Sequence, residues 1–183
     1  MTALRGEDPE GALEARALEA EGPHPLPQLD PRARVWAEID LGALERNYRY
    51  LTQRLPTDTK VLAVLKADAY GHGAVIVARR LIELGIAMIG VGDSTEALEL
   101  REAGVRAPLL VLGAIVPGEM ERIVAHDVAT CIHSHDRARL LSDVARALGK
   151  RAVVHLKIDT GMGRLGVRPE VAVALARDIS RDP

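Results

Sequence analysis

A lysine, an aspartate, a tyrosine and a histidine stand within KADAYGHG (66–73), directly after the apolar run VLAVL. A charged amine at the end of a buried strand is costly unless it has a partner or a function. Lys66 could bond covalently to an aldehyde cofactor such as pyridoxal phosphate, because partial burial lowers the pKa of such an amine. The alternative is a lysine whose side chain simply reaches from the strand end to water.

A second unusual segment is VVHLKID (153–159). With the period of a β-strand, His155, Lys157 and Asp159 share one face, which a buried strand would normally fill with apolar side chains. One interpretation is an internal ion pair between Lys157 and Asp159, and the other is a scaffold that orients a site residue. Arg164 follows in a glycine-rich loop, and its guanidinium suits a carboxylate or a phenolate oxygen.

Other candidate residues favour structural roles. His133 and His135 are separated by one serine, but no third ligand is evident, so no metal site is predicted. Cys131, in an expected strand, is interpreted as a small core residue. His72 is interpreted as a hydrogen-bonding residue of a turn.

Apolar runs alternate with amphipathic segments from Val35 onward. Capping residues are expected at Asp40, at Asp93 (with Glu96 in capping-box spacing) and at Ser134, and Gly85 is a natural helix stop. The expected strands are 35–41, 61–67, 88–91, 109–113, 129–132 and 153–159. The expected helices are 42–55, 73–85, 96–104, 118–126, 135–149 and a last one that begins at Pro169.

Strands separated by helices predict an α/β fold with a parallel sheet. An open doubly wound sheet and a (β/α)₈ TIM barrel both fit this pattern. The residues after 34 are fewer than the ~250 of a complete barrel, so a barrel would be incomplete, with about five of its eight βα units. In both architectures functional groups lie at the carboxyl ends of the strands, where Lys66 and the loop 159–166 would meet.

The composition is that of a globular protein, with 48% hydrophobic and 27% charged residues and a net charge of −2. This charge does not suggest nucleic-acid binding. The single cysteine excludes an internal disulfide and favours a cytoplasmic protein, and no apolar run reaches the ~18 residues of a membrane span. The N-terminus lacks a signal-peptide pattern. Residues 1–34 are predicted to be a disordered extension and 35–183 the folded domain.

The segment AVLKADAYGHGA (63–74) resembles the pyridoxal-phosphate attachment site of bacterial alanine racemases. Three other segments resemble the same family in the same order, namely WAEIDLGALERN (36–47), EALELREAGVRAPLLVLG (96–113) and HLKIDTGMGRLGV (155–167). The resemblance implies a TIM barrel of the pyridoxal-phosphate fold-type III and, for the full-length family, a homodimer that interconverts L-alanine and D-alanine. It implies D-alanine supply for peptidoglycan, with no nucleic-acid or membrane partner.

The resemblance also implies residue roles. Lys66 would carry the cofactor and act as one of two catalytic bases, and Tyr70 would help to hold the cofactor phosphate. Arg164 would contact the phenolic oxygen of the cofactor and the carboxylate of the substrate. Lys157 matches a lysine that many members carbamylate and that holds this arginine. Leu112 would line the cofactor ring.

The sequence departs from the family pattern where it ends. The second base of the family is a tyrosine in a C-terminal β domain, contributed across a head-to-tail dimer, and neither this domain nor the last barrel strands are in the sequence. The chain alone is therefore expected to be weak or inactive. The alternatives are another pyridoxal-phosphate barrel of the same fold type and a non-catalytic remnant that still binds the cofactor.

Overall fold

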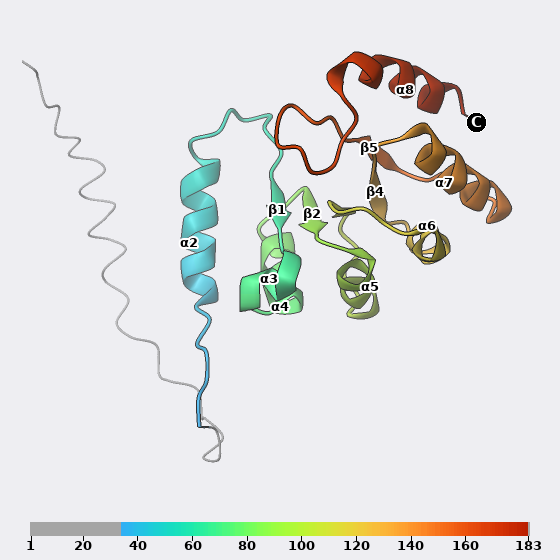
Figure 1. Cartoon of the computed structure of the whole chain (residues 1–183). Helices are drawn as coiled ribbons and strands as arrows, with labels where there is room; N and C mark the ends of the chain where they lie inside the picture. Colours follow the sequence, from blue (N-terminus) through green and yellow to red (C-terminus); the bar gives the residue numbers. More distant parts are fainter. Residues whose placement is uncertain (1–33, 183) are drawn as a thin grey trace, which may run out of the picture. The chain divides into compact units, whose positions relative to one another are not determined.

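Five short strands form one parallel sheet in the computed structural model, which describes residues 34–182. The strand order is β1-β2-β3-β4-β5, so every strand lies beside its neighbour in sequence (Figure 1). The strands are β1 (Leu62–Val64), β2 (Met88–Val91), β3 (Leu109–Val111), β4 (Ala129–Ile132) and β5 (Val154–Leu156). This order is that of consecutive βα units in a (β/α)₈ barrel, so the predicted α/β class is confirmed and the sheet is consistent with part of a TIM barrel.

One helix precedes β1, others connect successive strands, and a last one follows β5. They are α2 (Leu41–Thr52), α3 (Lys66–Gly71), α4 (Ala74–Glu83), α5 (Ser94–Glu102), the 3₁₀ turn η1 (Pro117–Glu119), α6 (Met120–Ala125), α7 (His135–Ala147) and α8 (Pro169–Arg181). The chain divides into two units, Met1–Glu38 and Ile39–Pro183, and all of these elements lie in the second. The extension expected at 1–34 falls, apart from Arg34, outside the described residues.

The two faces of the sheet carry different clusters. Ile89, Val111 and Ile132 belong to the main core, which the helices cover. The residues that alternate with them form a smaller apolar cluster on the inner face, built from Leu62, Met88, Leu110, Leu112, Ala129 and Cys131. Helices therefore cover one face, as right-handed crossovers between consecutive parallel strands require. The smaller cluster lines the other, inner face of the sheet.

Local sequence signals place most helix ends correctly. Asp40, Asp93 and Ser134 each accept a hydrogen bond from a backbone amide in the first turn of the following helix, as predicted. Gly85 has φ 86° just after α4, which suits a glycine. The strand expected at 35–41 is wrong: the structure has no strand there, because alternating side chains form a strand only where a neighbour pairs with the backbone.

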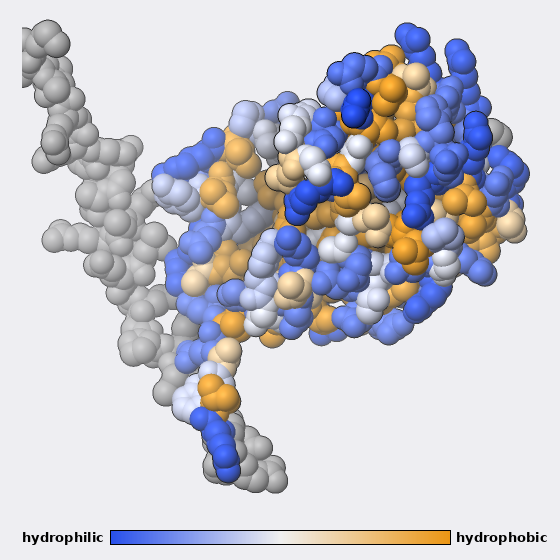
Figure 2. All heavy atoms as spheres, in the orientation of Figure 1, coloured by the Kyte–Doolittle hydropathy of each residue, from blue (hydrophilic) through white to orange (hydrophobic). Residues whose placement is uncertain are grey.

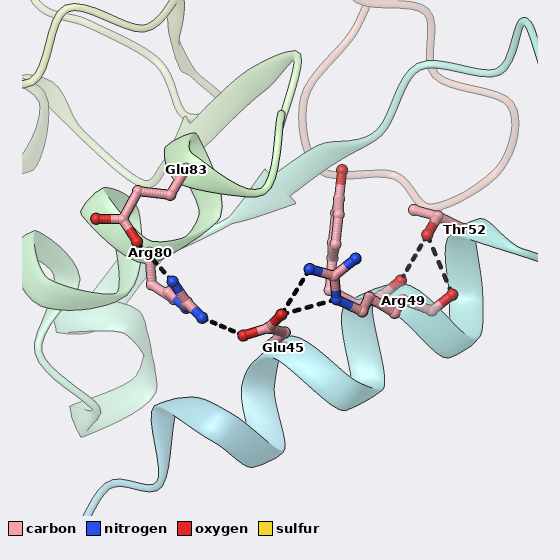
Figure 3. Close-up of polar contacts among 6 residues, drawn as sticks. Glu45, Arg49, Thr52, Arg80 and Glu83 are labelled. Carbon is pink, nitrogen blue, oxygen red and sulfur yellow. Dashed lines mark hydrogen bonds and ion pairs between the residues drawn. The ribbon is translucent and has the colours of Figure 1, made fainter. Parts of the chain in front are cut away.

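Helix α2 is joined to α4 by an ion-pair network (Figure 3). The carboxylate of Glu45 accepts hydrogen bonds from Arg49 on its own helix and from Arg80 on α4, and Arg80 also pairs with Glu83. The hydrogen bond from Arg49, followed by that from Arg80, lowers the pKa of Glu45 below its ordinary value. Ionised Glu45 therefore ties α2 to α4, beside the apolar contacts of Leu41, Leu44 and Tyr48 with the core.

The visible surface is mainly polar, with apolar areas over α7 and α8 (Figure 2). Exposed apolar side chains in these two helices include Leu140, Val171 and Val173. A hollow of about 540 Å³ lies between α7, β5 and the end of α8. Among the described residues, no helix is both long and apolar enough to cross a membrane.

Candidate active site

Lys66 lies at the carboxyl end of β1, as its sequence position predicted. The strand ends at Val64, earlier than expected, and Lys66 opens α3. The backbone amide of Leu65 still donates to Gly90 of β2, at 2.8 Å, so the lysine follows a residue that is held to the sheet. The Lys66 side chain is exposed rather than partly buried as expected, because no element covers the sheet edge there within the described residues, and its Nζ atom lies 5.9 Å from the centre of the Tyr70 ring.

The backbone after Lys66 is left-handed. Ala67, Asp68, Ala69 and Tyr70 have φ between 52° and 56°, and only the following residue is a glycine. A left-handed conformation costs roughly 1–2 kcal/mol for each residue with a side chain, and such strain concentrates at functional sites. The sequence pattern did not reveal this turn, because Asp68 is the only one of these four residues whose type favours the left-handed region.

Side chains and tertiary contacts hold this left-handed turn. The Asp68 carboxylate accepts a hydrogen bond from the backbone amide of Ala74 at 2.6 Å, which fixes the start of α4. The Glu96 carboxylate accepts one from the amide of Ala67 at 2.6 Å. Nδ1 of His72 lies 2.8 Å from the carbonyl oxygen of Ala69, so the interpretation of His72 as a turn residue is confirmed.

Lys157 and Leu112 are brought together on the inner side of the sheet. Nζ of the half-buried Lys157 donates to the Leu112 carbonyl at 2.8 Å, which links the ends of β5 and β3. The buried Cys131 lies between them on β4, and burial raises the pKa of its thiol while the charge of Lys157 lowers it. The expected core role of Cys131 is confirmed, and Lys157 places a cation at the carboxyl edge of the sheet.

The loop after β5 is closed by its own backbone. Asp159 N donates to the Val167 carbonyl at 2.8 Å, and Val167 N donates to the Lys157 carbonyl at 2.9 Å. The Asp159 carboxylate accepts hydrogen bonds from the amides of Gly161 and Gly163, which lower its pKa. The described residues show no ion pair between Lys157 and Asp159; the ionised carboxylate of Asp159 is stabilised by the loop amides instead.

Arg164 projects from the same loop and is exposed. Its Nε atom donates to Sδ of Met162 at 3.1 Å. In the described part of the chain, no polar contact joins Arg164 to Lys157. Its guanidinium is therefore open to an anionic group, and the pairing of the two residues stays a prediction.

The groups at this edge fit pyridoxal phosphate chemically. Lys66 offers an exposed amine that forms no ion pair with any residue in 34–182. The cofactor also carries a phosphate and a phenolic oxygen, both anionic, and Lys157 and Arg164 supply positive charge at the same edge. The fold and the site thus define an α/β barrel-type protein with an exposed lysine at a strand end.

Comparison with known proteins gives the family. Residues 39–183 match the family model described as alanine racemase, N-terminal domain. The alanine racemase of Methylacidiphilum infernorum is 45% identical over 81% of this chain and 38% of the relative. That of Syntrophobacter fumaroxidans is 46% identical over 74% of this chain and 36% of the relative.

Solved structures agree with these sequences. Alanine racemase from Clostridium difficile 630 superposes with a TM-score of 0.82 at 34% identity, over 84% of this chain and 41% of that one. The enzyme from Streptomyces lavendulae has a TM-score of 0.69 at 35% identity, over 76% and 38%. The chain belongs to the alanine racemase family and corresponds to its N-terminal domain. It spans under half the length of these relatives.

Proposed function

We propose that this chain is the cofactor-binding part of an alanine racemase, in which Lys66 carries pyridoxal phosphate and D-alanine is supplied for peptidoglycan. The observation that carries the proposal is the exposed amine of Lys66 at the carboxyl end of β1. The family match supports it. The homodimer and the alanine substrate are proposed from the family as well.

Bound pyridoxal phosphate would supply electron withdrawal that acidifies the Cα–H of the amino acid. Lys66 would then take this proton, or return one, at one face of Cα. Inversion needs a proton donor on the other face as well, and Lys66 reaches only one. A second base on the opposite face would have to supply that proton.

The neighbouring residues would bind and orient. Tyr70 is four positions after Lys66 and exposed, so its hydroxyl is available to a phosphate oxygen. Leu112 lies on the inner face, where it can pack against the cofactor ring. Arg164 would receive the substrate carboxylate and the phenolic oxygen.

Lys157 would serve as the anionic partner of Arg164 after carbamylation. Carbon dioxide adds to the neutral amine of Lys157, which loses a proton and becomes a carbamate. One N–H remains on Nζ, so the hydrogen bond to the Leu112 carbonyl is compatible with the modification. The change replaces repulsion between two cations by attraction.

The experiment is a titration of the purified chain with pyridoxal phosphate, followed by the absorbance of the lysine-bound cofactor. We expect saturable binding that is lost in Lys66→Arg. Lys60→Arg, which removes an exposed lysine six positions earlier, is the matched control and should bind like the unmodified chain. Equal loss in both variants, or binding that survives Lys66→Arg, would contradict the proposal.

A further inference from the structure

One carboxylate joins the carboxyl ends of β1 and β2. Oε1 of Glu96 accepts a hydrogen bond from the backbone amide of Ala67 at 2.6 Å, and Oε2 accepts one from that of Gly92 at 2.7 Å. Glu96 is half-buried in the first turn of α5. Its two oxygens therefore accept hydrogen bonds from the backbone amides of two different segments.

These contacts differ from ordinary helix capping. In a capping box the third helical residue reaches back to the amide of the capping residue, which here is Asp93. Asp93 does cap α5 through the amide of Glu96, at 3.0 Å. Glu96, however, binds the amide of Gly92 and that of Ala67, which lies 29 residues earlier in the sequence. Capping of α5 explains the contact of Glu96 with the Gly92 amide but not its contact with the Ala67 amide.

The contact between Glu96 and the Ala67 amide lies in the turn that carries Lys66. Ala67 directly follows the lysine and is the first of the left-handed residues, whose conformation has to be imposed from outside. Gly92 leaves the space for this arrangement: a Cβ atom at Gly92 would lie 3.2 Å from Oε2 of Glu96 and 3.5 Å from Cβ of Lys66. The Glu96 carboxylate and the base of the Lys66 side chain are thus neighbours.

We propose that Glu96 is a positioning residue for Lys66. By bonding to Ala67 and Gly92 together, its carboxylate fixes the left-handed turn to the end of β2 and so sets the direction in which the amine leaves the sheet. The importance of that direction for cofactor binding rests on the proposed function of Lys66. The effect of Glu96 on the backbone is independent of it.

The first measurement needs no cofactor and follows amide hydrogen exchange by NMR. Hydrogen bonds to a charged acceptor are strong, so Glu96→Ala should raise exchange at Ala67 by about ten-fold or more. Glu96→Gln keeps one accepting oxygen and should give an intermediate rate. Asp93→Ala is the matched control, because it weakens the start of the same helix but leaves the contact to Ala67.

The second measurement is the rate at which Lys66 binds pyridoxal phosphate. Slower binding in Glu96→Ala, intermediate binding in Glu96→Gln and unchanged binding in Asp93→Ala would support the proposal. Equal losses in Glu96→Ala and Asp93→Ala would overturn it, since Glu96 would then act only through α5. Unchanged exchange at Ala67 in Glu96→Ala would overturn it too.

The two proposals fail in different ways. If the unmodified chain does not bind pyridoxal phosphate at Lys66, the proposed function is wrong for this chain. Exchange at Ala67 then still decides whether Glu96 fixes the turn. Gly92→Ala crowds the same carboxylate without removing it, and it should also raise exchange at Ala67, which keeps the test valid if Glu96→Ala folds poorly.

Discussion

Individual side chains at the carboxyl edge are held mainly by backbone groups. The amide of Ala67 binds Glu96, Lys157 binds the Leu112 carbonyl, and the loop amides bind Asp159. Such contacts orient a side chain more firmly than exposed ion pairs, which contribute little. The backbone therefore fixes where the polar side chains of the candidate site lie.

Thr130 is a residue whose replacement should stabilise the protein. It is buried in β4, and its hydroxyl has no hydrogen-bond partner within the described residues. Thr130→Val removes this polar group at nearly constant volume, and we expect a gain of about 1 kcal/mol in the free energy of unfolding. Urea denaturation measures it, with Thr57→Val, at an exposed turn, as the control. A loss of stability in Thr130→Val would show that the hydroxyl is satisfied.

Gly166 should tolerate no side chain. Its φ is 137°, and a Cβ atom there would lie 2.5 Å from Asp159 N, inside the closed loop that carries Arg164. Gly166→Ala should cost roughly 1–3 kcal/mol and raise hydrogen exchange across 159–167. Gly161→Ala is the matched control, because Gly161 has φ 134° with nothing within 4 Å. Equal effects of both changes would mean that backbone strain alone matters.

At the level of single residues, the sequence predicted local roles better than distant contacts. Asp40 and Ser134 cap helices because their partners lie three residues away. The contact between Glu96 and Ala67 depends on how β1 and β2 pair, which local pattern does not encode. The spacing of Asp93 and Glu96 was the only available signal, and it indicated a helix cap.

Secondary-structure elements are joined by ion pairs as well as by the apolar core. Glu45 links α2 to α4 through Arg80, and α2 has no buried residue of its own. The strands 88–91 and 129–132 were predicted with correct ends, since apolar runs between turn residues mark buried strands. The segment 35–41 has an equally clear pattern but no strand, because pairing is a property of two elements.

The attachment of α2 should weaken in acid. The pKa of Glu45 is lowered in the folded chain, so its contribution is fully present above its ordinary pKa of about 4.5 and is lost as the pH falls through the lowered value. Glu45→Gln should therefore be less stable than the unmodified chain at neutral pH, with the difference vanishing below this window. Thermal unfolding against pH tests this, with Glu99→Gln as the control. A difference that is independent of pH would contradict it.

Residues 34–182 present five consecutive strands of a barrel-type sheet. Its neighbours in the family are more than twice as long. Because β1 and β5 each pair with only one strand within the described residues, both edges are open to further pairing. The site groups lie at the carboxyl end of this sheet, so we propose that the chain can bind the cofactor without supporting complete catalysis.

Turnover should therefore lag behind cofactor binding. We expect the purified chain of 183 residues to racemise L-alanine far more slowly than a full-length relative, because Lys66, in its proposed role, would protonate only one face of Cα. The measurement is D-alanine formation with saturating pyridoxal phosphate, with a full-length relative as the positive control. Turnover equal to that of the relative would contradict this prediction, because access to only one face of Cα would then not limit the rate.

The position of the bound cofactor decides whether Lys66 is the attachment site. The chain is mixed with pyridoxal phosphate, the bond is reduced with borohydride, and the labelled lysine is located by mass spectrometry. We predict one label per chain, at Lys66, and a lower selectivity in Glu96→Ala. Label that also appears on Lys60, Lys150 and Lys157 would contradict specific attachment at Lys66, because Lys66 would then react no differently from the other lysines.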